Sequence, residues 1–163
     1  MEIESFLLGE NDWVPNNARL PVLIYRGALQ GGGEDLAEQF EALFAEHGWP
    51  PDWRDGVFDY HHYHSSAHEA LGVFAGSATL ELGGPAGRHV EVSAGDALLL
   101  PAGTGHRCVS ASATFQVVGA YPQGQAWDIC REAPDPAGRA RIAALPDPRH
   151  DPVTGESGAR TGA

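Results

Sequence analysis

Histidines gather in one part of the chain, and their spacing suits metal binding. His62 and His64 stand two residues apart, and His106 follows further along. If His62 and His64 belong to a strand, their side chains share one face and are separated by about 7 Å at the standard rise. That separation allows both imidazoles to converge on one ion.

A carboxylate completes the candidate set of ligands. A turn is expected at residues 65–67, and Glu69 then begins a strand that can return opposite the histidines. Imidazoles together with one carboxylate suit Zn, Fe(II), Mn, Ni or Co. We therefore predict one divalent transition metal ion per chain, held by His62, His64, Glu69 and His106.

Neighbouring side chains are open to two interpretations. Tyr60 shares the face of His62 in the expected strand, where it either packs in the core or lines a pocket. We name Glu69 and Tyr60 as the candidate catalytic residues. His68 has the opposite parity to Glu69 and would face away from the ion, although a turn at this point leaves a ligand or supporting role open. Tyr121 also has an inward direction.

The elements that must position these residues are short strands. Runs of residues with β propensity are separated by glycine-rich turn signals at residues 83–85 and 93–96. The expected strands are residues 20–25, 57–63, 70–75, 77–82, 89–92, 97–100, 106–110 and 114–121. Strands of this length and spacing predict an antiparallel all-β barrel or sandwich.

One amphipathic helix is expected before the strands that follow residue 53. Its apolar positions recur at helical spacing over residues 34–47, and Gly48 is placed as its stop. These positions are Leu36, Phe40, Leu43 and Phe44. The stripe is most simply explained by packing on the sheet.

The chain is divided by composition into three parts. Residues 1–52 are expected to form an arm, a strand and the helix, all packed on a barrel core at residues 53–130. Residues 131–163 are rich in Pro, Asp, Arg and Gly. That composition is compatible with a wrapping C-terminal arm or a partly disordered tail.

Charge and cysteine content narrow the class of protein. The 163 residues carry a net charge of -12, which repels phosphate backbones and anionic membranes, so neither nucleic acid nor membrane is an expected partner. The two cysteines, Cys108 and Cys130, are too few for a disulfide framework. Cys108 shares the parity of His106, and inert packing is its simplest role. With no signal peptide or long apolar run, a cytoplasmic location is expected.

Two motifs resemble those of the cupin superfamily. Residues 56–76 match a glycine, five residues, His-x-His, a short gap, Glu, six residues and a glycine. Residues 95–106 match a glycine, five residues, Pro-x-Gly, two residues and His, and Ser110 stands where the pattern usually has Asn. The runs NNARLPVLIYRGAL, HHYHSSAHEALGVFAG and VVGAYPQGQ are similar to the YjlB-like group of small bacterial cupins. The resemblance implies a double-stranded β-helix (jelly-roll) barrel, a metal site and a homodimer.

The donor set leaves three functions open. Four protein ligands leave exchangeable positions on a six-coordinate ion but close a tetrahedral zinc site. Our leading hypothesis is a metal-dependent small-molecule enzyme of the oxygenase or isomerase type, with the metal as Lewis acid or dioxygen platform. The alternatives are a non-catalytic protein that binds metal and a small ligand, and a cupin whose metal is purely structural. A deep apolar cavity beside the ion would favour catalysis or capture.

Overall fold

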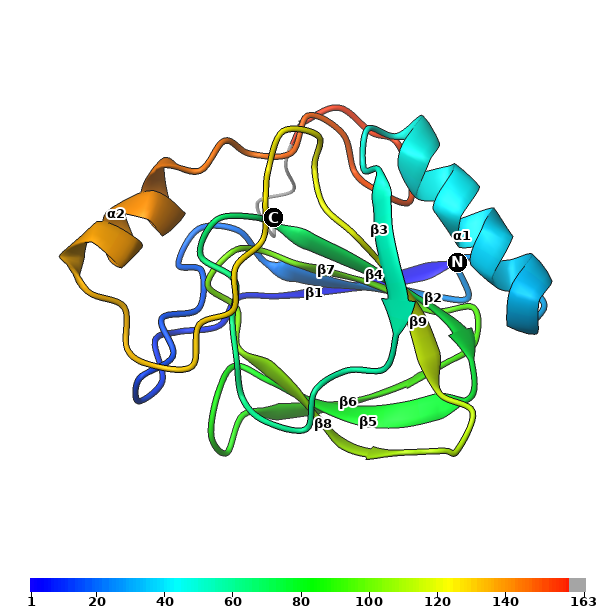
Figure 1. The fold of residues 1–163 in the computed structure, drawn as a ribbon, viewed down its shortest axis with the longest axis horizontal. Coiled ribbons are helices and arrows are strands. Elements are labelled where there is room, and N and C mark those ends of the chain that lie inside the picture. The colour runs from blue at the N-terminus through cyan, green and yellow to red at the C-terminus, as the bar shows by residue number, and fades with distance from the viewer. Residues whose placement is uncertain (159–163) are drawn as a thin grey trace.

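Two β-sheets and two helices make up the chain in the computed structural model, which describes residues 1–158 (Figure 1). The larger sheet has six strands in the order β1-β2-β7-β4-β9-β3, and the smaller has three in the order β6-β5-β8. The strands are β1 (Glu2–Phe6), β2 (Val22–Arg26), β3 (Pro51–Asp55), β4 (Glu69–Ala75), β5 (Ser77–Leu82), β6 (Arg88–Ser93), β7 (Ala97–Leu100), β8 (His106–Ala111) and β9 (Gln116–Ala120). The helices are α1 (Gly33–Glu46) and α2 (Pro136–Ala144). The expected all-β jelly-roll class is confirmed.

The inner strands of the larger sheet are buried on both faces, as β2 shows by alternating between two cores. Val22 and Ile24 pack with Leu80 of β5 in the core between the sheets. Leu23 and Tyr25 point the other way and pack under α1. Alternation along a strand thus explains why β2 is a nearly continuous apolar run.

Helix α1 confirms the expected amphipathic helix and covers the outer face of the larger sheet. Leu36, Phe40 and Phe44 are fully buried against that sheet. The helix approaches β4 so closely that a Cβ atom on Gly72 would lie 2.5 Å from Cγ of Phe40. A larger residue at position 72 would therefore push α1 off the sheet.

One expected strand is wrong. Residues 57–63 do not form a strand, and β3 lies earlier in the chain, where it pairs with β9. The following residues cross from the larger sheet to the smaller one, so they cannot follow the ladder of either. They make isolated bridges, from His62 to His106 and from Tyr63 to Cys130, and the carbonyl of Phe58 accepts from Cys108 N at 2.8 Å.

The terminal segments are tied to the barrel. The expected N-terminal arm forms β1, which pairs with β2 of the same chain. Helix α2 was not predicted, because it carries almost no apolar stripe, although Asp135 at its N-cap and Pro136 at its first position are helix-start signals. After α2 the chain runs back beside α1, where Trp49 Nε1 donates to the carbonyl of His150 at 2.8 Å. Residues 159–163 lie outside the described residues. They end the C-terminal segment, whose composition is compatible with either a wrapping arm or a partly disordered tail.

Within residues 1–158, neither helix has the length and apolar character needed to cross a membrane. The division of the chain at residues 52 and 130 remains a prediction.

Candidate metal centre

Three predicted histidines meet at one end of the barrel. One ligand atom from each of His62, His64 and His106 lies within 4.8 Å of the other two, and all three residues are buried. His106 begins β8, and His62 is bridged to it through the backbone. The first and second motifs, far apart in sequence, are therefore joined at the site.

Backbone carbonyls fix the orientation of the three rings. Each Nδ1 atom lies at a carbonyl, that of Tyr60 for His62 (3.1 Å), Asp128 for His64, and Thr104 for His106 (2.9 Å). A carbonyl only accepts hydrogen bonds, so each Nδ1 must carry the hydrogen. Each Nε2 atom is then left to accept a proton or a metal, as in histidines that bind metal.

Glu69 faces the histidines from the first position of β4. Its Oε1 lies 3.2 Å from Nε2 of His106, and its Oε2 lies 3.2 Å from Nε2 of His64. His64 Nε2 and Glu69 Oε1 are nevertheless buried without a well-oriented hydrogen bond. Unsatisfied buried polar atoms are costly, and a divalent cation would satisfy both. These residues therefore fit a divalent metal ion.

The charges of the cluster favour the same conclusion. Burial, reinforced by nearby His106, lowers the pKa of His62 to about 3, so this imidazole is neutral at pH 7. Burial opposes the charged form of Glu69, but His64 and His106 outweigh it and hold the pKa of the carboxyl well below its ordinary value. Burial likewise opposes protonation of His64, but Glu69 raises the pKa of its ring above the ordinary value. A divalent ion would supply the positive charge that the Glu69 carboxylate otherwise draws from a protonated His64.

Tyr121 and Trp53 hold the carboxylate in place. The Tyr121 hydroxyl donates to Glu69 Oε2, and Trp53 Nε1 donates to the Tyr121 oxygen at 3.0 Å. Burial, followed by the charge of Glu69, raises the pKa of Tyr121 above its ordinary value, so the hydroxyl keeps its hydrogen. The inward direction expected for Tyr121 is confirmed.

A loop on the other side holds His64. The carbonyl of Asp128 accepts from His64 Nδ1, while its carboxylate accepts from the backbone N–H of Ser65 at 2.6 Å and from the Ser65 hydroxyl. Arg141 of α2 donates to the same Ser65 oxygen at 2.9 Å. The loop that carries Asp128 is therefore fastened to the chain that carries His64.

Two other candidate residues lie outside the cluster. Tyr60 stacks on Phe58 with 4.8 Å between ring centroids, does not line the cavity, and contributes its carbonyl to His62. A catalytic role for Tyr60 remains a prediction. His68 turns away, accepts from the N–H of Ala102 at 2.9 Å and lies 3.2 Å from the carbonyl of Pro146. It ties the start of β4 to the C-terminal arm.

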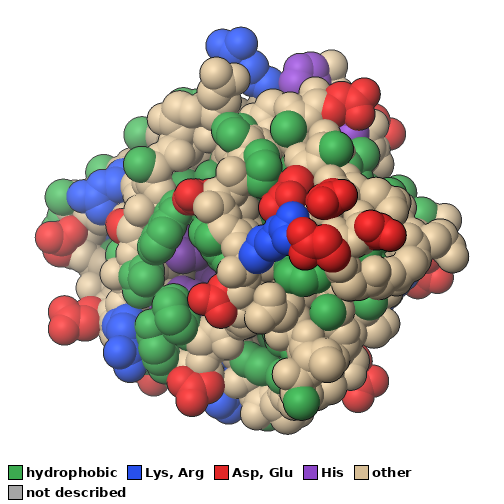
Figure 2. All heavy atoms as spheres, turned by 45° about the vertical axis from the view of Figure 1, so that its right-hand side comes forward, with side chains coloured by type: hydrophobic (Ala, Val, Ile, Leu, Met, Phe, Trp, Pro, Cys, Tyr) green, Lys and Arg blue, Asp and Glu red, His purple; other side chains and the backbone are tan. Residues whose placement is uncertain are grey.

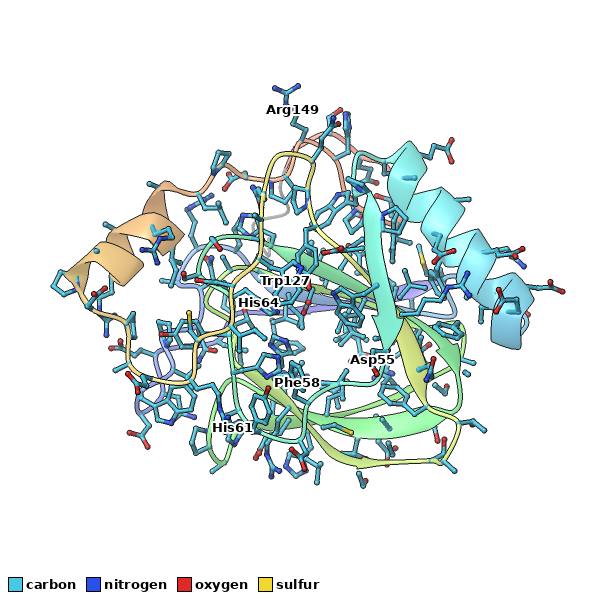
Figure 3. The ribbon with its side chains drawn as sticks, viewed as in Figure 1. Asp55, Phe58, His61, His64, Trp127 and Arg149 are labelled. Atoms are coloured by element: carbon cyan, nitrogen blue, oxygen red, sulfur yellow. The ribbon has the colours of Figure 1, made fainter. Side chains whose placement is uncertain are left out.

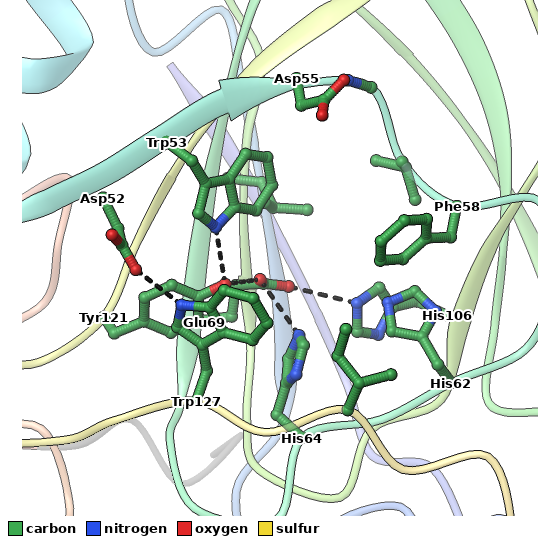
Figure 4. Close-up of a pocket in the computed structure, with 14 residues that line it drawn as sticks. Asp52, Trp53, Asp55, Phe58, His62, His64, Glu69, His106, Tyr121 and Trp127 are labelled. Atoms are coloured by element: carbon green, nitrogen blue, oxygen red, sulfur yellow. Dashed lines mark hydrogen bonds and ion pairs between the residues drawn. The ribbon is translucent and has the colours of Figure 1, made fainter.

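The cluster lies at the bottom of a cavity of about 420 Å³ (Figure 4). In the space-filling view, histidine side chains are visible in a hollow bordered by hydrophobic side chains (Figure 2). The ring of Trp127 lies beside that of His64, with 6.0 Å between centroids (Figure 3). Trp53 and Trp127 belong to neither motif, and no signal in the sequence marks them as part of the site.

Comparison with known proteins agrees with the fold and the cluster. The sequence pattern of the Cupin domain family matches residues 52–118, a range that contains the three histidines and Glu69. The fold and the site thus define a cupin. The chain is also 36% identical over 159 residues to Uncharacterized protein YjlB of Bacillus subtilis (strain 168). The aligned residues cover 95% of this chain and 92% of that protein. The chain belongs to the YjlB-like group of the cupin superfamily.

One solved structure is a more distant match. It is a DUF861 family protein from Thermotoga maritima, 20% identical, with a TM-score of 0.36 over 50% of this chain and 86% of that one. An overlap of this size adds nothing to the assignment.

Proposed function

We propose that this cupin is a metal-dependent enzyme that acts on a small molecule, of the oxygenase or isomerase type. His62, His64, Glu69 and His106 would hold one divalent transition metal ion, with its identity open among Fe(II), Mn, Ni, Co and Zn. A bound ion of this kind supplies a Lewis acid for a hydroxyl, carbonyl or carboxylate oxygen, or a platform for dioxygen.

The observation that supports this proposal is the cavity beside the cluster. A purely structural ion needs no space around it, whereas here about 420 Å³ of cavity extends to all four proposed ligands. Its walls are mostly apolar, with polar groups at the bottom and two carboxylates, Asp52 and Asp55, on β3, as in sites that bind small molecules. The cavity thus favours catalysis or capture over a structural ion.

The surrounding residues have distinct roles in this proposal. Trp53, Phe58 and Trp127 exclude water and orient an apolar ligand. Glu69 Oε2 is already occupied by the hydroxyl of Tyr121. Oε1, the oxygen that has no well-oriented partner, would face the ion, and it would accept a proton from a bound ligand only while it is released from the ion.

The experiment begins with the metal found in protein purified without added metal. The protein is loaded with that metal and offered small hydroxy and keto compounds, under air and under argon, with product formation and dioxygen uptake as readouts. Turnover by the wild type that is lost in His62→Ala/His64→Ala supports the proposal. Binding without turnover would replace it with the second candidate, a protein that captures a small ligand.

A further inference from the structure

We propose that the cavity is selective for a cationic ligand, an amine with an apolar body of about one ring and an oxygen donor at its inner end. This inference rests on the proposed function for the inner end of the ligand, where the oxygen meets the ion. The selectivity at the outer end rests on separate residues, described next.

The charged residues of the cavity are all acidic. Of the 14 described residues drawn as lining it in Figure 4, none is Lys or Arg, and three are carboxylates: Asp52, Asp55 and Glu69. A bound divalent ion would more than offset Glu69 and leave about one net positive charge at the bottom of the cavity, where the oxygen donor of the ligand would bind. Asp52 and Asp55, both exposed on β3, would leave the mouth negative. An anionic group at the outer end of a ligand would meet this charge without a basic partner.

The neighbouring arginines are engaged elsewhere. Arg54, which lies between Trp53 and Asp55 on β3, donates to Glu41 at 2.8 Å and to Glu34 at 2.9 Å. Arg131 stacks its guanidinium on the ring of Tyr60, 3.8 Å from the centroid, outside the cavity. Neither guanidinium is directed toward the ligand space.

Aromatic rings stand beside these carboxylates. Trp127 Nε1 donates to Asp52 Oδ2 at 2.6 Å, so this indole and this carboxylate are held together at the mouth. Trp127 also stacks on Tyr121, with 6.0 Å between centroids and 24° between planes. Aromatic faces attract ammonium groups, and an adjacent carboxylate adds to that attraction. Rings and carboxylates in this arrangement are complementary to an amine.

The exposure of the rim indicates a ligand surface. Among the described residues, six large hydrophobic side chains are exposed, and three of them, Phe58 (48%), Trp127 (41%) and Ile129 (40%), line this one cavity. Exposed apolar groups gathered around a cavity mark a binding site. They would enclose the apolar body of the ligand between the ion and the acidic mouth.

The test uses three phenols that differ mainly in charge: tyramine (a cation), 4-ethylphenol (neutral) and 4-hydroxyphenylacetate (an anion). Binding is measured by calorimetry on metal-loaded and on metal-free protein. We expect tyramine to bind about tenfold more tightly than 4-hydroxyphenylacetate, and more tightly than 4-ethylphenol. Raising the ionic strength from about 0.01 M to about 1 M should weaken tyramine binding and leave 4-ethylphenol unchanged.

Matched variants locate the selectivity. Asp52→Asn/Asp55→Asn should abolish the preference for tyramine, while Glu2→Gln, on β1 at the opposite edge of the larger sheet, should keep it. The inference is overturned if the anion binds as tightly as the cation, if no probe binds, or if the double variant keeps the preference. Metal content is measured on the same samples to separate the two proposals. A preference for the cation in protein that binds no metal would contradict the proposed function but not the selectivity of the cavity.

Discussion

His62 and His106 exchange both backbone hydrogen bonds of an antiparallel bridge, from His62 N to His106 O at 3.3 Å and from His106 N to His62 O at 2.9 Å. Their ring centroids are consequently 4.1 Å apart. The bridge is made by the backbone, so this pair is held together by the fold rather than by an ion. The proposed metal site is therefore preorganised, because the fold holds His62 and His106 together whether or not an ion is bound.

Glu69→Gln should leave much of the metal bound and change the melting temperature little. The three histidines remain fixed by the fold, and three protein ligands are the usual number in catalytic sites. The Gln side chain keeps the size and an acceptor for Tyr121 but loses the charge. Metal content and melting temperature are measured side by side with the wild type. A large fall in both would favour a structural metal, because such an ion contributes directly to folding.

Asp128→Ala should weaken metal binding by about 10- to 100-fold, because groups that orient a ligand affect affinity on this scale. The substitution keeps the carbonyl that accepts from His64 but removes the carboxylate that fastens the loop to Ser65. Competition with a chelator measures the affinity. Asp35→Ala, an exposed acid on α1, is the control and should bind as the wild type does. Equal metal affinities for the Asp128 and Asp35 variants would show that the Asp128 carboxylate does not support the metal site.

His68→Gln should reduce the loss of stability in acid. Burial lowers the pKa of His68 from 6.5 to about 4, so over this range the unfolded chain binds a proton that the folded chain does not. The free energy of unfolding must therefore fall as the pH drops from 6.5 toward 4, and be fully retained above 6.5. His68 accounts for roughly 3 kcal/mol of that fall.

Urea unfolding of metal-free protein at about pH 7 and about pH 4 measures the effect, since the other titrating groups are common to both proteins. The fall should be smaller in His68→Gln by about the amount given above. Identical falls in the variant and the wild type would show that His68 is not held neutral by burial.

The chain is expected to form a homodimer. Strand β1 covers the edge of β2 within the chain, yet β1, β3, β6 and β8 still stand at sheet edges. Exposed edges are commonly covered by pairing of chains, and two-fold dimers are the commonest closed assembly. Light scattering at micromolar concentration should give twice the chain mass. A single-chain mass would contradict the expectation.

Much of the fold could be predicted because its strands carry local signals. The turns at residues 83–85 and 93–96 separate β5, β6 and β7 as expected. The four proposed ligands were found from motif spacing, and the structure brings them together. His62 and His64 were expected to meet by strand alternation, but they lie in a crossing loop, and it is the bridge to His106 and the carbonyl of Asp128 that orient them.

The rest of the site depends on contacts between distant segments. The alternation of side chains along a strand could not predict which way Tyr60 points, because residue 60 does not belong to a regular strand. Trp127 reaches His64 from a loop after β9, and Trp53 reaches Tyr121 across paired strands. Neither contact has a local signature, since each needs the pairing of β3 with β9 or the fastening of the Asp128 loop.

Metal content per chain is the most direct test of the central claim. Wild-type protein, His62→Ala/His64→Ala and the control His89→Ala are purified in parallel, and their divalent metals are measured by elemental analysis. His89 is an exposed histidine of β6 that contacts Glu81 and lies outside the cluster. The account predicts about one ion per chain in the wild type and in His89→Ala, and almost none in the double variant. Full metal content in His62→Ala/His64→Ala would contradict it.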